Sequence, residues 1–332
     1  YEITYGDWSS DVCSSDLGKI YHGGLDDAPT WSVPWQTPKA TKYALPDNLA
    51  LDNRNRGSGA DADGPQPSGS QVRGPAFECA DVPDDTYQDG KVADLAIATL
   101  RQRSQQQEPF FLAVGFIKPH LPFIAPKKYW DLYDPAKIAL AANPFRAKDA
   151  PDYAVLPGGE LRNYHGIPEG SIPDDLARRL KHGYYAAVSY TDAQIGRLLD
   201  ELDRLGLREN TIVILWGDHG WKLGEHDAWC KHSNVENDVH APLILAAPDM
   251  PHRGASTDAL VEFVDIYPTL CDLAGLPRPA HLEGLSFKPV LDDPARPWKK
   301  AAFSQYPRSS GEGSGRDLMG YSMRTDRYRL TR

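Results

Sequence analysis

A run of apolar residues, 212 to 216, passes directly into a cluster of Asp, His, Glu and Lys side chains. A short continuous apolar run predicts a strand that is covered on both faces, in a parallel or mixed sheet. In open α/β sheets the reactive groups gather just beyond the carboxyl ends of strands, which is where Asp218 and His219 lie. The competing interpretation is that the two residues only cap a loop. We favour a functional site because Glu225, His226 and Lys231 follow within one polar loop.

A second strand end repeats this pattern. Residues 110 to 117 predict a buried strand, and Lys118, Pro119 and His120 follow it at once. A cation and an imidazole are thereby expected near the first motif. From the residues alone an alternative is equally open, in which the prolines stiffen a turn and His120 hydrogen-bonds to the backbone.

The rest of the chain alternates predicted strands with amphipathic helices. Apolar spacing predicts helices over residues 89–107, 173–205 and 265–274, and further strands over residues 242–247 and 259–264. In the long middle helix, the carboxylates of Asp200, Glu201 and Asp203 are expected on a solvated face.

Two regions depart from this alternation. Residues 26–85 are loop-rich, and residues 52–74 carry too few apolar side chains to order themselves. Near the C-terminus, residues 301–308 and 321–330 alternate polar and apolar side chains, which predicts half-exposed antiparallel strands in a small second lobe.

Composition excludes several classes of function. The chain has 36 basic and 46 acidic residues, so its net charge of −10 argues against a nucleic-acid partner and leaves any anionic substrate to local cations. No apolar run reaches the roughly 18 residues of a membrane span, and no signal peptide is visible. The four cysteines lack paired spacing, so neither a disulfide framework nor a structural zinc site is predicted.

Several segments carry a resemblance to a known family: GKIYH at 18–22, FFLAVGFIKPHLPF at 110–123, YYAAVSYTDAQIGRLLDELD at 184–203, WGDHGWKLGEHDAWCKHSN at 216–234, and the later SQYP and MGYSMRT. Together they resemble type I sulfatases, in the iduronate-2-sulfatase-like branch of the alkaline phosphatase superfamily. The resemblance implies an α/β fold, with a central mixed sheet flanked by helices and a smaller C-terminal antiparallel lobe. It also implies hydrolysis of a sulfate ester of a sulfated sugar, by a formylglycine hydrate on one divalent metal.

The resemblance assigns residue roles. Asp218 and His219 match the family's metal ligands, for Ca²⁺ or alternatively Mg²⁺, although calcium generally prefers oxygen ligands. Four further side chains match the cations that grip sulfate or protonate the leaving oxygen, which are Lys19, His22, His120 and Lys231. Aimed donors of this kind stabilise the charge that builds on the leaving oxygen.

The departures from the family matter equally. The family has an Asp-Asp pair on its first strand and a Cys- or Ser-x-Pro-Ser-Arg nucleophile segment at a helix start, and neither feature is found here. Residues 1–17 do not resemble the family, so we interpret them as foreign or misassembled sequence, and Cys13 is not a formylglycine precursor. Residues 18–295 are interpreted as the core and 296–332 as the start of a C-terminal subdomain. We expect an inactive piece of an enzyme that is truncated at both ends, with a periplasmic or secreted parent.

Some alternatives remain open. A phosphomonoester or phosphonate hydrolase of the same superfamily would use similar cations, and a non-catalytic sulfated-glycan binder would use the same cation pocket. Trp221 and Trp229 could either stack on a sugar ring of the substrate or pack in the hydrophobic core. Glu225 and His226 could either contact the substrate or hydrogen-bond to the metal ligands and orient them.

Overall fold

The computed structural model describes residues 13–21, 27–55, 73–150, 159–309 and 317–332. The chain divides into two compact units, and each is described by itself. The first unit comprises residues 1–148, 157–208 and 223–229, and the second comprises residues 149–156, 209–222 and 230–332. Among the described residues, no helix is both long and apolar enough to cross a membrane.

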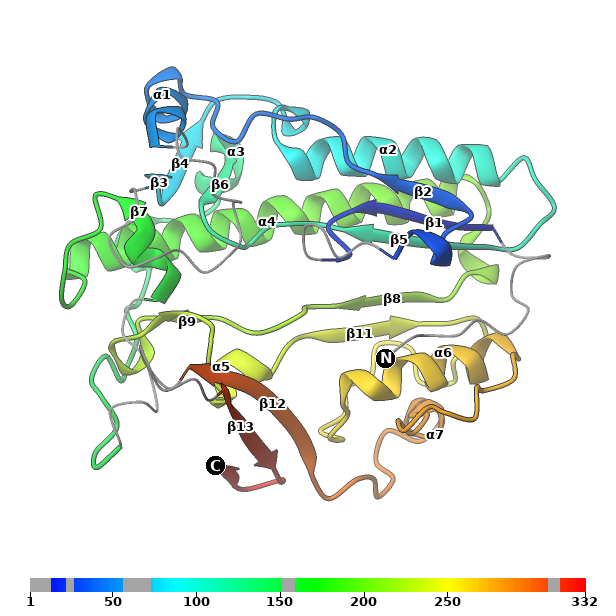
Figure 1. The fold of residues 1–332 in the computed structure, drawn as a ribbon. Helices are drawn as coiled ribbons and strands as arrows, with labels where there is room; N and C mark the ends of the chain where they lie inside the picture. Colours follow the sequence, from blue (N-terminus) through cyan, green and yellow to red (C-terminus); the bar gives the residue numbers. More distant parts are fainter. Residues whose placement is uncertain (1–12, 22–26, 56–72, 151–158, 310–316) are drawn as a thin grey trace. The chain divides into compact units, whose positions relative to one another are not determined.

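The first unit is built on a parallel sheet in the order β2-β1-β5 (Figure 1). Its strands are β1 (Cys13–Gly18), β2 (Val33–Gln36) and β5 (Phe110–Gly115). The predicted strand at 110–117 is therefore confirmed, although Phe111 is 48% exposed and the strand is not fully buried. Part of the segment interpreted as foreign forms β1, in continuous register with β5 from Cys13↔Phe110 to Gly18↔Gly115.

Two long helices support this sheet (Figure 1). Helix α2 (Gln88–Arg103) packs on β1 and β5, and α4 (Asp174–Arg204) packs on α2. Both helices were predicted from the apolar stripe, and α4 ends just before Gly206, whose φ of +69° suits glycine.

The expectation that the late acids of α4 form a solvated face is wrong for Glu201. This side chain is buried, with 6% exposure of the residue, because its carboxylate accepts hydrogen bonds from Arg101 of α2 and Arg204 of its own helix. Apolar periodicity could not show this contact, because the partner arginine lies a hundred residues away in the sequence.

The loop-rich region also contains elements that the sequence did not predict. These are α1 (Pro46–Asn55), β3 (Arg73–Pro75) and β4 (Phe77–Ala80); β3 pairs in parallel with β7 (Tyr164–His165), and β4 with β6 (Phe123–Pro126). Together with α3 (Lys127–Trp130), they enclose an aromatic core that includes Tyr43, Trp130 and Tyr190. Distant partners order these short segments, which have little periodicity of their own.

The second unit contains an antiparallel pair, β8 (Val213–Trp216) and β11 (Leu243–Ala246). Both strands were predicted, but Trp216 is 46% exposed, so β8 is not covered on both faces as expected. Helix α6 (Ile266–Ala274) and α7 (Lys288–Asp292) form a small core with these strands.

The strand predicted at residues 259–264 is absent from this described part of the second unit. Glu262 and Asp265 instead form a capping box, in which each side chain accepts the other's backbone N–H, and this begins a helical turn at Phe263. Of the apolar residues that suggested a strand, Ala259 and Val261 pack against the core from an irregular segment, whereas Phe263 and Val264 are more than half exposed.

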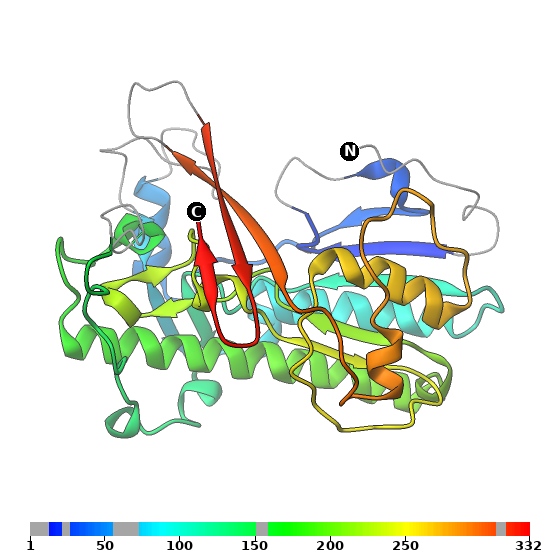
Figure 2. The ribbon, with the colours of Figure 1, turned by 90° about the horizontal axis from the view of Figure 1, so that it is seen from below.

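The C-terminal lobe is an antiparallel sheet, as expected, with β12 (Ala302–Ser309), β13 (Asp317–Arg324) and β14 (Arg329–Thr331) (Figure 2). The remaining short elements are β9 (Lys222–Leu223), β10 (Trp229–Cys230) and α5 (Glu236–Val239). Parallel strands, long helices and this sheet confirm the α/β fold class, and they place polar side chains at the ends of β1, β5 and β8.

Candidate functional site

The first unit contains a cavity of about 270 Å³ that is rich in cationic side chains. Its basic lining residues are Lys19, Lys42, Arg73, Lys118 and His120. Two of them, Lys19 and His120, were predicted as site residues from the sequence. The structure therefore brings together the residues that follow β1 and those that follow β5.

Two facing glycines make this approach possible. Gly18 and Gly115 are paired in the β1–β5 register, and Lys19 donates its backbone N–H to the Gly115 carbonyl over 2.9 Å. A Cβ on Gly115 would lie 2.0 Å from the Lys19 carbonyl oxygen, and one on Gly18 would lie 2.2 Å from the Gly115 carbonyl oxygen. Gly18 also has a φ of +79°. Side chains are excluded from both positions, so the two strand ends lie against each other.

Asp89, in the first turn of α2, holds the turn that follows β5. Its carboxylate accepts the backbone N–H groups of Ile117 at 2.9 Å and Lys118 at 2.8 Å, and the residue is 1% exposed. Burial raises the pKa of Asp89, while these two N–H donors oppose that shift. The helix thereby fixes the backbone on which Lys118 and His120 stand.

Lys118 is a half-buried cation whose amine folds back onto its own turn. Its Nζ donates to the carbonyl oxygens of His120 at 3.0 Å and Pro122 at 2.7 Å. Burial lowers the pKa of Lys118 to about 8, against the opposing effect of Asp89. The sequence placed this residue at a strand end but gave it no role, and the structure adds it to the cavity wall.

His120 has an oxygen acceptor near each ring nitrogen. Nδ1 lies 2.8 Å from the Leu121 carbonyl oxygen, and Nε2 lies 3.3 Å from Oε2 of Glu160. Oε1 of Glu160 accepts a hydrogen bond of 3.0 Å from Arg73. Both ring nitrogens of His120 therefore have an oxygen partner within the first unit. Sequence reasoning missed Arg73 and Glu160 because both lie in segments without a strand or helix pattern.

The second unit carries the residues that follow β8. The side chain of Asp218 is 77% exposed and that of His219 is 30% exposed, with Nε2 of His219 3.7 Å from Oδ1 of Asp218. Lys231 places its Nζ 4.9 Å from the centre of the Trp221 ring, which in turn lies 5.9 Å from the His219 ring. Trp221 therefore packs beside two predicted site residues, and a cation–π contact holds Lys231 on it.

Among the described residues, no group of three or more His, Cys, Asp or Glu side chains is arranged to hold a metal ion. Calcium takes about six to eight oxygen ligands, and magnesium requires an octahedral set. Asp218 and His219 thus do not fit a complete metal centre by themselves, and no step of the reaction is assigned to a metal here.

Backbone strain is concentrated in the loop around Lys231. His226, Asp227, Cys230 and His232 all have φ between +55° and +87°, a region that residues with a side chain rarely adopt. Such conformations cost on the order of 1–3 kcal/mol each and gather at functional sites. The strain favours a functional role for this loop over a plain connection.

Three other residues of this loop, Glu225, His226 and Trp229, contact the rest of the protein. Trp229 is only 2% exposed, which supports the core interpretation over a sugar platform. Glu225 accepts the backbone N–H of Leu223 at 2.6 Å, and Nε2 of His226 lies 3.2 Å from Nδ2 of Asn143.

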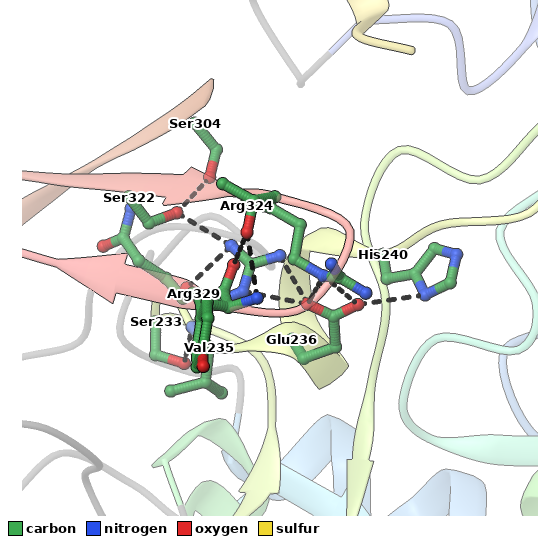
Figure 3. A network of polar contacts seen from close by, with 11 residues as sticks. Ser233, Val235, Glu236, His240, Ser304, Ser322, Arg324 and Arg329 are labelled. Carbon is green, nitrogen blue, oxygen red and sulfur yellow. Dashed lines mark hydrogen bonds and ion pairs between the residues drawn. The ribbon is translucent and has the colours of Figure 1, made fainter. Parts of the chain in front are cut away.

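The segment after Lys231 is fixed on two sides. Lys222 is 1% exposed, and its amine forms ion pairs with Asp238 of α5. On the other side, Glu236 of α5 accepts hydrogen bonds from Arg324 and Arg329 of the C-terminal sheet (Figure 3). Opposite charges thus hold α5 from two directions within the second unit.

The predicted site residues are therefore divided between the units. Lys19 and His120 line the cavity of the first unit, while Asp218, His219 and Lys231 follow β8 and β10 in the second. His22 lies outside the described residues.

Comparisons with known proteins match most of the chain. The sulfatase family model matches residues 28–276, and the model described as N-sulphoglucosamine sulphohydrolase, C-terminal, matches residues 224–332. Iduronate 2-sulfatase of Mus musculus is 34% identical over 381 residues, covering 95% of this chain and 67% of the relative. Iduronate 2-sulfatase of Homo sapiens is 33% identical, and the match again covers 95% of this chain and 67% of the relative.

A solved structure is similar as well. The phosphonate monoester hydrolase SpPMH from Silicibacter pomeroyi has a TM-score of 0.65 and 25% identity, over 84% of this chain. The chain spans only 58% of the length of that protein.

Proposed function

The chain belongs to the sulfatase family, with its alkaline phosphatase-like fold, and on this premise we propose that the whole protein hydrolyses sulfate monoesters of carbohydrates. The observation that carries the proposal is the cation-lined cavity whose wall includes both Lys19 and His120. The names of the mammalian relatives, iduronate 2-sulfatases, support a sulfated sugar as the substrate class. The net charge of −10 argues against a nucleic-acid partner.

The chemistry of sulfate ester hydrolysis suits these side chains. Negative charge builds on the leaving oxygen and on the sulfuryl oxygens, and donors already held in place stabilise it without reorganising. In our proposal Lys19 and His120 are two such donors, and His120 also gives a proton to the leaving oxygen. Loss of one donor of this kind typically costs about 3 kcal/mol of transition-state stabilisation.

We propose further roles on the basis of the family motifs. His22 and Lys231 are proposed as additional catalytic cations, and the strained backbone around Lys231 supports this role for Lys231. Asp218 and His219 are proposed as two ligands of a divalent cation, Ca²⁺ or Mg²⁺. A periplasmic or secreted location is proposed on the family resemblance alone.

The cavity is tested directly by ligand binding. NMR titration of the chain with methyl sulfate should show saturable shifts, and Lys19→Ala or His120→Ala should weaken binding about tenfold or more, because each removes a cationic donor. Lys137→Ala, at an exposed lysine of the same unit, serves as the matched control. Equal effects of all three substitutions would refute the proposed anion site.

Turnover by this chain is a separate question. We propose that this 332-residue chain releases no sulfate from 4-nitrophenyl sulfate, because it contains no Cys- or Ser-x-Pro-Ser-Arg nucleophile segment. Metal-dependent release that is lost in Lys231→Ala would contradict this. In a whole enzyme with the segment present, the position matching Asp218 should be essential.

The second candidate is a phosphonate or phosphate monoester hydrolase, which the similarity to SpPMH favours. Parallel assays of a whole homologous enzyme on sulfate, phosphate and phosphonate monoesters decide between them, by the ratio of kcat/KM values. Binding of sulfated sugar that persists with a chelator, and without turnover in that enzyme, would instead indicate a glycan-binding protein.

A further inference from the structure

We propose that Glu160 sets the charge preference of the first-unit cavity, so that it favours monoanionic esters such as sulfate monoesters over dianionic phosphate monoesters. This inference rests on the proposed function, since it concerns the same anion site. It adds a residue that decides specificity and that none of the family motifs in the sequence contains.

The position of Glu160 is defined by two contacts. Its carboxylate bridges Arg73, at 3.0 Å from Oε1, and His120, at 3.3 Å from Oε2. The side chains are only partly exposed, at 12% for Glu160 and 15% for each of its partners. Both partners line the cavity, so a carboxylate lies directly against its cationic wall. Partial burial reduces screening by solvent, which strengthens the effect of this charge on a bound anion.

The charges around the cavity nearly balance. Lys42 pairs with Asp52 at 3.0 Å, and Arg73 pairs with Glu160 at 3.0 Å. Asp89 lies against the turn that carries Lys118. The four lysine and arginine side chains of the lining, Lys19 included, therefore face three carboxylates. Among the residues that the structure describes, one positive charge therefore remains in excess, without counting His120.

Such a balance discriminates between ligands by their charge. A sulfate monoester carries one negative charge, whereas a phosphate monoester carries about 1.5 to 2 at neutral pH. Repulsion from the Glu160 carboxylate scales with ligand charge, so it acts about twice as strongly on the dianion. The two esters have similar size and geometry, so the cavity can distinguish them mainly by this difference.

The experiment compares methyl sulfate with methyl phosphate as probes. Dissociation constants are measured by NMR titration at pH 7.5, above the second pKa of about 6 of a phosphate monoester, for the unchanged chain and for Glu160→Gln. The substitution should tighten methyl sulfate binding severalfold and methyl phosphate binding by about the square of that factor. A fivefold gain for the first probe would thus accompany a gain of about 25-fold for the second.

Two further variants complete the test. Glu160→Asp keeps the charge and should keep the original preference, which separates charge from packing. Glu209→Gln removes a carboxylate from an exposed ion pair with Arg253 and should change neither constant. Equal factors for the two probes in Glu160→Gln, or a preference lost in Glu160→Asp, would overturn the role of Glu160 while leaving the anion site intact. Binding of neither probe to the unchanged chain would overturn the proposed function as well.

Discussion

At the scale of single residues, buried charge shapes the turn after β5. Asp89 accepts two backbone N–H groups, and the Lys118 amine binds two carbonyl oxygens of the same turn. Both charges, the buried Asp89 and the half-buried Lys118, are thus satisfied by the backbone of the segment that carries His120. Removal of either would leave polar groups buried without a partner, which is costlier than the net value of the hydrogen bonds themselves.

Asp89→Asn should therefore lower the free energy of unfolding by about 1–3 kcal/mol, because an amide offers only one acceptor oxygen to the two N–H donors. Urea denaturation measures the loss. Asp94→Asn is the matched control, since Asp94 lies on the same helix in a largely exposed pair with Arg197. If the two substitutions cost the same, Asp89 does not hold the turn.

At the scale of the elements, close approach and charge pairing join neighbouring segments. The glycines at the ends of β1 and β5 let the strands meet, and Glu201 joins α4 to α2 through Arg101. Both features act between elements that are far apart in the sequence. The two glycines and the Glu201 ion pair therefore stabilise the packing between elements, and not the helix or strand propensity of any single element.

Gly115→Ala should destabilise the first unit and displace Lys19, because the new Cβ would lie 2.0 Å from the Lys19 carbonyl oxygen. We expect lower thermal stability and weaker methyl sulfate binding together. In contrast, Gly196→Ala in α4 meets no atom within 4 Å and should raise stability by about 0.5–1 kcal/mol, as expected for alanine in a helix. Unchanged binding in Gly115→Ala would contradict the proposed role of the close approach.

The Glu201 contact predicts a dependence of stability on pH. Hydrogen bonds from Arg204 and Arg101 lower the pKa of Glu201 to about 2, from 4.5. Because the pKa is lower in the folded state, the stabilisation is present above pH 4.5 and is lost as the pH falls toward 2. The difference in urea midpoint between the unchanged chain and Glu201→Gln should shrink over this range. A difference that stays constant with pH would exclude the charge as its cause.

At the scale of the whole molecule, the chain is organised as two units, and the C-terminal sheet belongs to the second. Within that unit, Arg324 and Arg329 bind Glu236, which follows Lys231 by five residues (Figure 3). Burial alone would raise the pKa of Glu236, but hydrogen bonds from Arg329 and Arg324 hold it below its usual range. The last strands of the chain thus bear directly on the segment that carries a proposed catalytic cation.

Glu236→Ala should loosen this connection and leave both arginines without their carboxylate. Amide hydrogen exchange in β13, β14 and α5 should become faster, while α2 and α4 of the other unit keep their protection. Glu209→Ala, which breaks an exposed pair of the same unit, provides the comparison. Equal exchange in the two variants would show that the network does not hold the sheet to α5.

Much of the fold could be predicted from the sequence, because apolar periodicity records which face of an element is buried. The runs at β5, β8 and β11 and the stripes of α2 and α4 indicated an α/β class, and the alternation near the end indicated the C-terminal sheet. The same logic failed at residues 259–264, where a side-chain capping box outweighs apolar content. It also failed in the loop-rich region, where pairing with distant partners creates β3 and β4.

The sequence by itself determined the family and the motifs at the strand ends, since residue type and local order are sufficient for both. Only the tertiary structure decided which charged side chains form ion pairs with each other. Arg73 and Glu160 come from segments 87 residues apart, and Glu201 finds its arginine in another helix. The physical reason is that an ion pair depends on distance in space, and no local pattern in the chain encodes the partner that folding brings within a few ångströms.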